Sequence, residues 1–264
     1  MKTIFLRVFL GIVVLCPSFT VFGQAPKERA WQMLRASVSD KSADRRAQSV
    51  RALGLLKGDV EAIRITRKAL GDENPDVRAA AATASEDLHC TPCIPDLRKA
   101  IQDKDVSVVL AAAHALHAFG DATAYEVYYA VLTGERKTGN GLVADQEAML
   151  KDPKKMAKFG FEQGIGFVPF GGIGWGIIST IAKDDTSPVR ASAAAVLAND
   201  PDPQSGQALV KAVSDKSWVV RAAALEAIAR RGDARLLDSI VPALSDGHDV
   251  VRMNAAAAVI HLSR

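Results

Sequence analysis

A pattern that recurs about every 31 residues constrains this chain of 264 residues more than any other feature of its sequence. Each copy has an Asp, four further residues, Val-Arg or a near match, and then a run rich in Ala. The copies begin at Asp40, Asp72, Asp103, Asp184, Asp215 and Asp246. Successive copies are 31 or 32 residues apart, except for a step of 81 residues from Asp103 to Asp184. Such periods are typical of repeat proteins, in which each unit buries its apolar face only against its neighbours.

Each copy predicts two short helices. The residues before the Asp are apolar at helical spacing, as in Leu236-Leu237-Ile240-Leu244. A polar residue and Pro then favour a new helix start, as at Asn74-Pro75. The Ala-rich run allows close helix packing and agrees with an aromatic content of only 6%. We therefore expect an all-α fold, a right-handed α-solenoid of about six to seven stacked antiparallel helix pairs.

These Asp-x4-Val-Arg-x2-Ala units resemble the HEAT-repeat family, including the bacterial HEAT-like repeats of the phycobilin-lyase type. The resemblance covers nearly all of residues 27–264 apart from an interruption at 134–182. It implies that Asp and Arg side chains of neighbouring repeats form a hydrogen-bonded ladder along the solenoid. The residues of that ladder would be Asp72, Arg78, Asp184, Arg190, Asp215, Arg221, Asp246 and Arg252. We interpret all eight as structural.

The first 23 residues have the layout of a secretory signal peptide. Two basic residues precede an apolar stretch from Val8 to Leu15, and small residues end at Gly23. Cys16 lacks the preceding small residue that a lipoprotein signal needs. We expect cleavage after Gly23 and a periplasmic or secreted protein. Cleavage would lower the net charge from +3 to +1, which excludes nucleic-acid binding by bulk electrostatics.

After the leader, we expect one continuous solenoid in three parts. N-terminal repeats would occupy residues 24–133 and C-terminal repeats residues 183–264, with a degenerate repeat and a Gly/Phe-rich insertion at 134–182 between them. Seven of the 19 Gly residues lie between positions 160 and 176. Residues 163–182 carry no charged side chain and lie next to a cluster of Lys, and long insertions in compact folds are often functional.

Three interpretations of the insertion remain open. It would pack against the solenoid, bind a protein partner as a loop, or touch a membrane peripherally. The side chains that would make such contacts are Lys154, Lys155, Lys158, Phe159, Phe161, Phe167, Phe170 and Trp175.

Cys90 and Cys93 form a C-x-x-C motif at a predicted helix start. In an exported protein the plain interpretation is a local disulfide. Two alternatives stay open, namely a redox-active thiol pair and a metal site in which His117 joins the two Cys.

The sequence has no Walker loop, no G-x-S-x-G and no H-E-x-x-H. It also lacks the His-Glu pairs that hold iron in the HEAT-like deoxyhypusine hydroxylases. We therefore predict a non-catalytic protein-binding scaffold or adaptor that acts outside the cytoplasm, without cofactor or metal. One alternative is a HEAT-like lyase or hydroxylase relative that handles a metal or chromophore. Another is a membrane-associated adaptor that uses residues 151–182.

Overall fold

The computed structural model describes residues 25–133 and 186–264, which form twelve α-helices and three short 3-10 helices, and no strand. The α-helices are α1 (Pro26–Ser37), α2 (Ala43–Leu53), α3 (Val60–Ala69), α4 (Pro75–Asp87), α5 (Ile94–Ala100), α6 (Val106–Ala118), α7 (Thr123–Thr133), α11 (Ser187–Leu197), α12 (Pro203–Ala212), α13 (Trp218–Arg231), α14 (Leu237–Ile240) and α15 (Asp249–Leu262). The 3-10 helices are η1 (Thr91–Cys93), η2 (Ala234–Leu236) and η3 (Val241–Ser245). The predicted all-α solenoid is confirmed. The described part contains five complete helix pairs. Helices α7 and α11 flank the residues that are not described, so each stands without a described partner helix in its own pair.

Polar caps and left-handed glycines set the ends of these helices. The Asn74 side chain accepts a hydrogen bond from the Asp76 N–H at 2.8 Å, and Pro75 occupies the first position of α4. The Asp59 carboxylate caps α3 by accepting from two N–H groups, each at 3.0 Å. Gly232 ends α13 with φ of 69°, a conformation that Gly adopts without strain.

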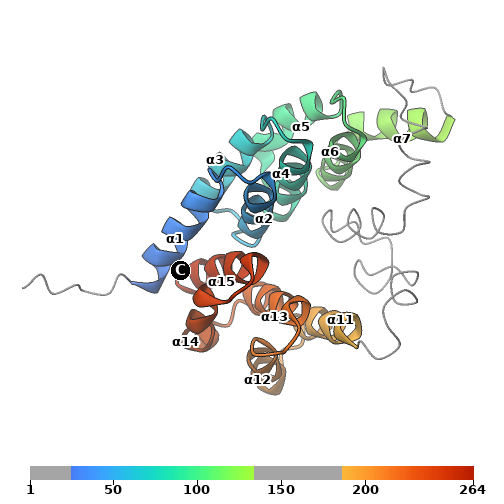
Figure 1. Cartoon of the computed structure of the whole chain (residues 1–264). Helices are drawn as coiled ribbons and strands as arrows, with labels where there is room; N and C mark the ends of the chain where they lie inside the picture. Colours follow the sequence, from blue (N-terminus) through green and yellow to red (C-terminus); the bar gives the residue numbers. More distant parts are fainter. Residues whose placement is uncertain (1–24, 134–185) are drawn as a thin grey trace, which may run out of the picture.

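The helices form two rows along a crescent (Figure 1). Successive second helices of the pairs pack against one another, α2 on α4 on α6 and α11 on α13 on α15. They make an inner row on the concave side, and the first helices make an outer row. The core between neighbours is built largely of buried Ala, as at Ala79, Ala81 and Ala256. Small side chains let the inner helices lie close together, which explains how a chain with few aromatics forms a packed core.

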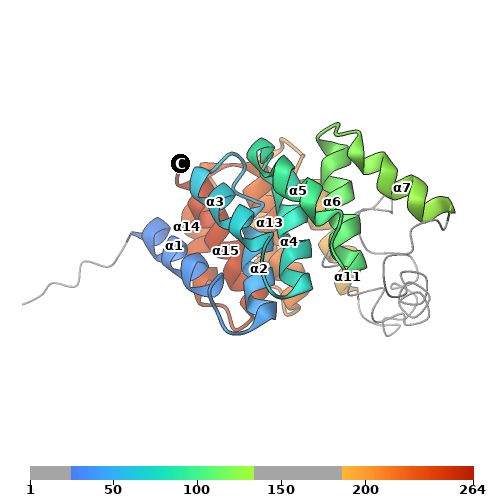
Figure 2. The same ribbon diagram turned by 90° about the horizontal axis from the view of Figure 1, so that it is seen from above.

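The two ends of the described chain meet in the middle of the crescent. Helix α15 packs against α1 and α2, and both views place these helices side by side (Figures 1 and 2). The Arg264 guanidinium donates to the carbonyls of Leu56 and Lys57 at 3.2 and 2.9 Å, and Arg45 pairs with Asp249 at 3.2 Å. The inner row therefore runs α11, α13, α15, α2, α4, α6. The C-terminal repeats precede the N-terminal repeats in space.

Three predicted features lie outside the described residues. They are the signal peptide, the whole segment 134–182 with its Lys, Phe and Trp side chains, and Asp184. In the part that the structure describes, no helix is both long and apolar enough to cross a membrane.

Candidate binding surface

The inner row is joined by a ladder of Arg–Asp pairs. Arg78 donates to both carboxylate oxygens of Asp103, at 2.7 and 2.9 Å, and a third N–H donates to the Asp72 carbonyl at 2.8 Å. Arg221 holds Asp246 in the same way, at 2.8 and 3.0 Å. The other inner-row pairs are Arg46–Asp72 and Arg190–Asp215. Three of these pairs are bidentate, whereas Arg190 reaches Asp215 through one nitrogen, and each pair fixes one repeat against the next.

The ladder changes at the junction of the two halves. Arg252 still donates to the Asp246 carbonyl, at 2.6 Å, but its other hydrogen bond goes to Asp249 on its own helix. Asp249 in turn pairs with Arg45 of α2. The C-terminal and N-terminal repeats are thus joined by a different ion pair from the one used elsewhere.

Two ladder residues escaped the sequence prediction. Arg46 belongs to the copy that has lost its Val, and Asp103 belongs to the copy that has lost its Arg. The spacing alone is enough to place Arg46 on the ladder, because Arg46 follows Asp40 by six residues just as Arg78 follows Asp72. Asp103 keeps its role because its carboxylate accepts hydrogen bonds from Arg78 of the preceding repeat. This role does not require an Arg in the same copy as Asp103.

Three of the ladder carboxylates have pKa values below the ordinary value for Asp. Burial alone would raise the pKa of Asp72, Asp103 and Asp246. Hydrogen bonds from the paired Arg and from a backbone N–H, together with the charge of that Arg, outweigh burial and lower each pKa below its ordinary value.

The two cysteines are joined to each other. Cys90 and Cys93 form a disulfide between α4 and α5, and both are fully buried. The third metal candidate, His117, packs edge-on against the rings of Tyr125 and Tyr128 on α7, at 5.7 and 6.3 Å between centroids. No group of three metal-ligating side chains occurs among the described residues.

Among the buried side-chain atoms that have no hydrogen-bond partner within the described structure, three belong to α2 and α15, near the junction of the two halves. Gln48 and Arg51 lie one turn apart on α2, on the side opposite the buried Ser49, Val50 and Leu53. Gln48 Oε1 and Arg51 Nη1 are shielded from solvent, and neither has a hydrogen-bond partner in the described structure. The same holds for Nδ1 of His261 on α15, the neighbouring helix of the inner row.

Asp87, at the C-terminal end of α4, brings a carboxyl group to this region. A Cβ at Gly54 would lie only 3.0 Å from the Asp87 Cβ, so the Gly permits the close approach of α4 to the end of α2. Surrounding protein removes much of the hydration of Asp87, although its side chain reaches solvent, and this desolvation raises its pKa. Arg51 opposes the shift.

The facing half of the crescent contributes charges to the same place. Arg230 lowers and Glu226 raises the pKa of Asp87, so both α13 side chains lie within electrostatic range of α4. They also pair with each other at 2.8 Å. We call the following set the concave cluster: Gln48, Arg51, Asp87, Glu226, Arg230 and His261. The cluster draws on four inner helices from both halves, and it offers both donors and acceptors to a ligand.

Comparison with known proteins identifies the repeats. A family model described as HEAT repeats matches residues 65–136 and 176–260, which is more than half of the chain. The chain belongs to the HEAT-repeat family. No curated protein matches it.

The solved structures that resemble this chain are distant in sequence. The complex of CpcE and CpcF of phycocyanin lyase from Nostoc sp. PCC7120 is 19% identical, with a TM-score of 0.36 over 86% of this chain and 85% of that one. Human deoxyhypusine hydroxylase in complex with glycerol is 16% identical, with a TM-score of 0.32 over 89% and 84% of the two chains. An engineered protein is 14% identical, with a TM-score of 0.28 over 89% and 96%.

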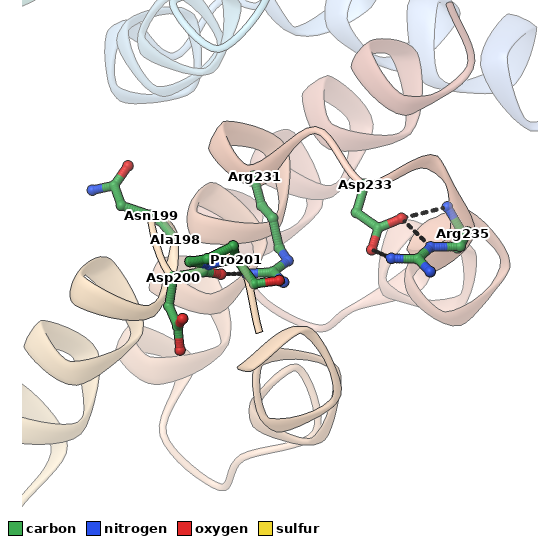
Figure 3. Close-up of a pocket in the computed structure, with 7 residues that line it drawn as sticks. All are labelled: Ala198, Asn199, Asp200, Pro201, Arg231, Asp233 and Arg235. Atoms are coloured by element: carbon green, nitrogen blue, oxygen red, sulfur yellow. Dashed lines mark hydrogen bonds and ion pairs between the residues drawn. The ribbon is translucent and has the colours of Figure 1, made fainter. Parts of the chain in front are cut away.

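A second surface feature of the HEAT repeats is a depression of about 290 Å³ beside the C-terminal end of α13 (Figure 3). Its charged groups already have partners. Arg231 donates to the carbonyls of Asp200, Pro201 and Asp202, and Arg235 pairs with Asp233 at 2.8 Å. These bonds fasten the turn before α12 to α13, so the depression serves the packing of two repeats.

Proposed function

We propose that this protein is a HEAT-repeat scaffold that acts outside the cytoplasm and binds a polypeptide partner on its concave face. The observation that carries the proposal is the concave cluster, in which the charges of Arg51, Glu226 and Arg230 all act on Asp87 and so bring both halves of the inner row together. A protein partner is large enough to span the row and to meet these charges.

The rigid architecture of the inner row also supports a role in binding a partner. Bidentate Arg–Asp pairs and Ala-packed helices hold the inner row in a fixed curve. A surface that is already ordered loses little entropy when a partner binds. Curved arrays of stacked repeats present extended concave surfaces of this kind.

Capture of a partner tests this proposal. The purified protein is immobilised and exposed to an extract of the cell envelope, in parallel with Arg51→Ala and with Arg64→Ala on the exposed outer face of α3. We expect a partner to be retained by the wild type and by Arg64→Ala, and to be lost from Arg51→Ala. Equal retention by all three proteins would place the binding surface elsewhere.

Export is the second part of the proposal. The leader-like composition of residues 1–23 supports it, and a disulfide between Cys90 and Cys93 suits an oxidising compartment. N-terminal sequencing of the protein purified from its native host is the test. A mature chain that begins at Gln24 supports export, whereas a retained Met1 contradicts it.

The composition of 151–182 supports an additional contact with the partner. Deletion of residues 159–178 should then weaken capture of the partner without lowering the melting temperature. Failure of the deletion variant to fold would show instead that the segment packs against the solenoid. Flotation of the intact protein with vesicles of anionic lipid would favour the membrane adaptor.

A further inference from the structure

Helix α11 carries apolar side chains on two opposite faces. Ala191 and Ala194 lie on one face and are 6% and 4% exposed, and α11 packs against α13 and α12 among the described helices. Val189, Ala193 and Val196 lie on the opposite face, at the spacing of four and three residues that keeps side chains on one side of a helix. Val189 and Val196 are 58% and 66% exposed, and Ala193 is exposed too. We call these three residues the free face of α11.

The equivalent face is buried in other inner helices. Helices α4, α6, α13 and α15 each carry a Val and two Ala at the same spacing, and a preceding inner helix packs against each of them. These side chains are at most 2% exposed: Val77, Ala81, Ala84, Val108, Ala112, Ala115, Val220, Ala224, Ala227, Val251, Ala255 and Ala258. Helix α11 stands at the end of the described row, with α13 beside it (Figure 1). Its free face is therefore a helix-packing surface that no described helix covers.

We propose that the free face of α11 binds the same face of a second molecule of this protein, with the two helices antiparallel. The order of the side chains is the same from either end of the helix, with Val at both ends and Ala193 beside the midpoint. In an antiparallel pair, each Val189 faces Val196 of the other molecule, and the two Ala193 side chains face each other. A two-fold symmetric interface requires a self-complementary surface of this kind.

The charges on α11 favour this pairing. Arg190 is the only charged residue of the helix, and it is already paired with Asp215 of its own molecule. Antiparallel helices place opposite ends of their dipoles together.

The sizes of the side chains also favour a second molecule over the preceding part of the same chain. Small side chains at a contact let two helix axes approach to about 8 Å. Residues 134–185 contain four Ala among 52 residues and many bulky Phe, Trp and Lys side chains, whereas α11 of a second molecule presents Ala and Val. The free face lies outside the concave cluster, so the inference goes beyond the proposed function and does not depend on it.

Disulfide trapping of the full chain tests the pairing. One helix pair buries less area than a standard interface, so the dimer is weak, and a covalent bond makes it measurable. Ala193→Cys is oxidised mildly beside the matched control Ala195→Cys, which is exposed on another side of the same helix. We expect Ala193→Cys to form a covalent dimer at least about tenfold faster than the control, because Cys side chains that face each other across the two-fold axis are within reach of a disulfide.

Charges at the two Val positions test the antiparallel register. Val189→Lys combined with Val196→Lys should slow the crosslinking of Ala193→Cys at least about tenfold, because like charges then meet across the interface. Val189→Lys combined with Val196→Glu should restore the rate, since each introduced ammonium then meets a carboxylate of the other molecule. At low protein concentration these variants should melt like the wild type, because the free face is exposed in the monomer.

Three results would overturn the inference. The first is equal crosslinking at positions 193 and 195. The second is a rate that the opposite charges do not restore. The third is a lower melting temperature for Val189→Lys at low concentration, which would mean that residues of the same chain cover the free face. Capture of the envelope partner is measured separately, so the scaffold proposal stands or falls independently of these results.

Discussion

Replacement of Arg221 by Ala removes one rung of the inner ladder, and its cost can be worked out from the structure. The guanidinium donates to both oxygens of Asp246 and to the carbonyl of Asp215, at 2.8 Å for the shortest bonds. The side chains of Arg221 and Asp246 are 18% and 13% exposed. The cost of breaking this pair should therefore be closer to that of a buried ion pair than to that of an exposed one. The variant leaves Asp246 charged and desolvated without its main partner.

Breaking a fully buried pair costs about 3–5 kcal/mol, whereas an exposed pair contributes about 0.2–1 kcal/mol. Asp246 keeps one hydrogen bond in the variant, from the His248 N–H at 2.8 Å, and this lowers the penalty. We therefore expect a loss of about 2–3 kcal/mol in the free energy of unfolding. For a chain of this size that is a fall of roughly 4–12 °C in the melting temperature.

The assay is urea denaturation followed by circular dichroism, with Arg35→Ala as the matched control. Arg35 forms the same bidentate geometry with Glu61, at 2.7 and 2.8 Å, but is 48% exposed. We expect the control to lose less than about 1 kcal/mol. Equal losses in the two variants, or no loss in Arg221→Ala, would refute the argument that burial makes the inner ladder the stronger one.

The same pair predicts a pH dependence. The folded pKa of Asp246 is lowered, so its contribution to stability is present above the unfolded value of 3.8 and is lost as the pH falls through the folded value. The difference between wild type and Arg221→Ala should therefore shrink below about pH 4. A difference that stays constant from pH 7 to pH 3 would contradict this assignment.

Three further predictions concern Asp87, His114 and the cysteine pair. The pKa of Asp87 is raised, so its charged form destabilises the fold and Asp87→Asn should unfold at a higher temperature than the wild type at pH 7, but not at pH 3. Hydrogen bonding to Glu86 raises the pKa of His114, so the advantage of the wild type over His114→Gln should be present below pH 6.5 and should vanish as the pH rises through the folded value. The mature protein, denatured without reductant, should show no free thiol from Cys90 and Cys93, and two after reduction.

The repeat period accounts for much of the fold. An Asp and an Arg six residues apart, followed by Ala, mark where each inner helix begins and which face of it is buried. Arg78 and Arg221 could be placed on the ladder because the pattern around them is intact. Arg46 was missed because Arg45 occupies the position of the Val, which hides the register although the spacing from Asp40 is unchanged.

The order of the repeats in space could not be read from the sequence. It depends on contacts such as Arg264 with Leu56 and Arg45 with Asp249, which join residues more than 200 positions apart. No periodic signal connects these positions, because the contacts join the two ends of the array and not successive copies of the repeat. The concave cluster depends on the same closure, since Glu226 and Arg230 come near Asp87 only when the C-terminal half stacks on the N-terminal half.

The central claim is that the C-terminal repeat stacks on the N-terminal repeat within one molecule, and crosslinking tests it most directly. Arg29 on α1 donates to the Ser245 hydroxyl at 2.9 Å, so p-benzoylphenylalanine in place of Arg29 should crosslink to η3, Val241–Ser245. The account predicts this crosslink in the monomer band, independent of protein concentration. Crosslinks only between molecules, or only to neighbouring N-terminal repeats, would contradict it.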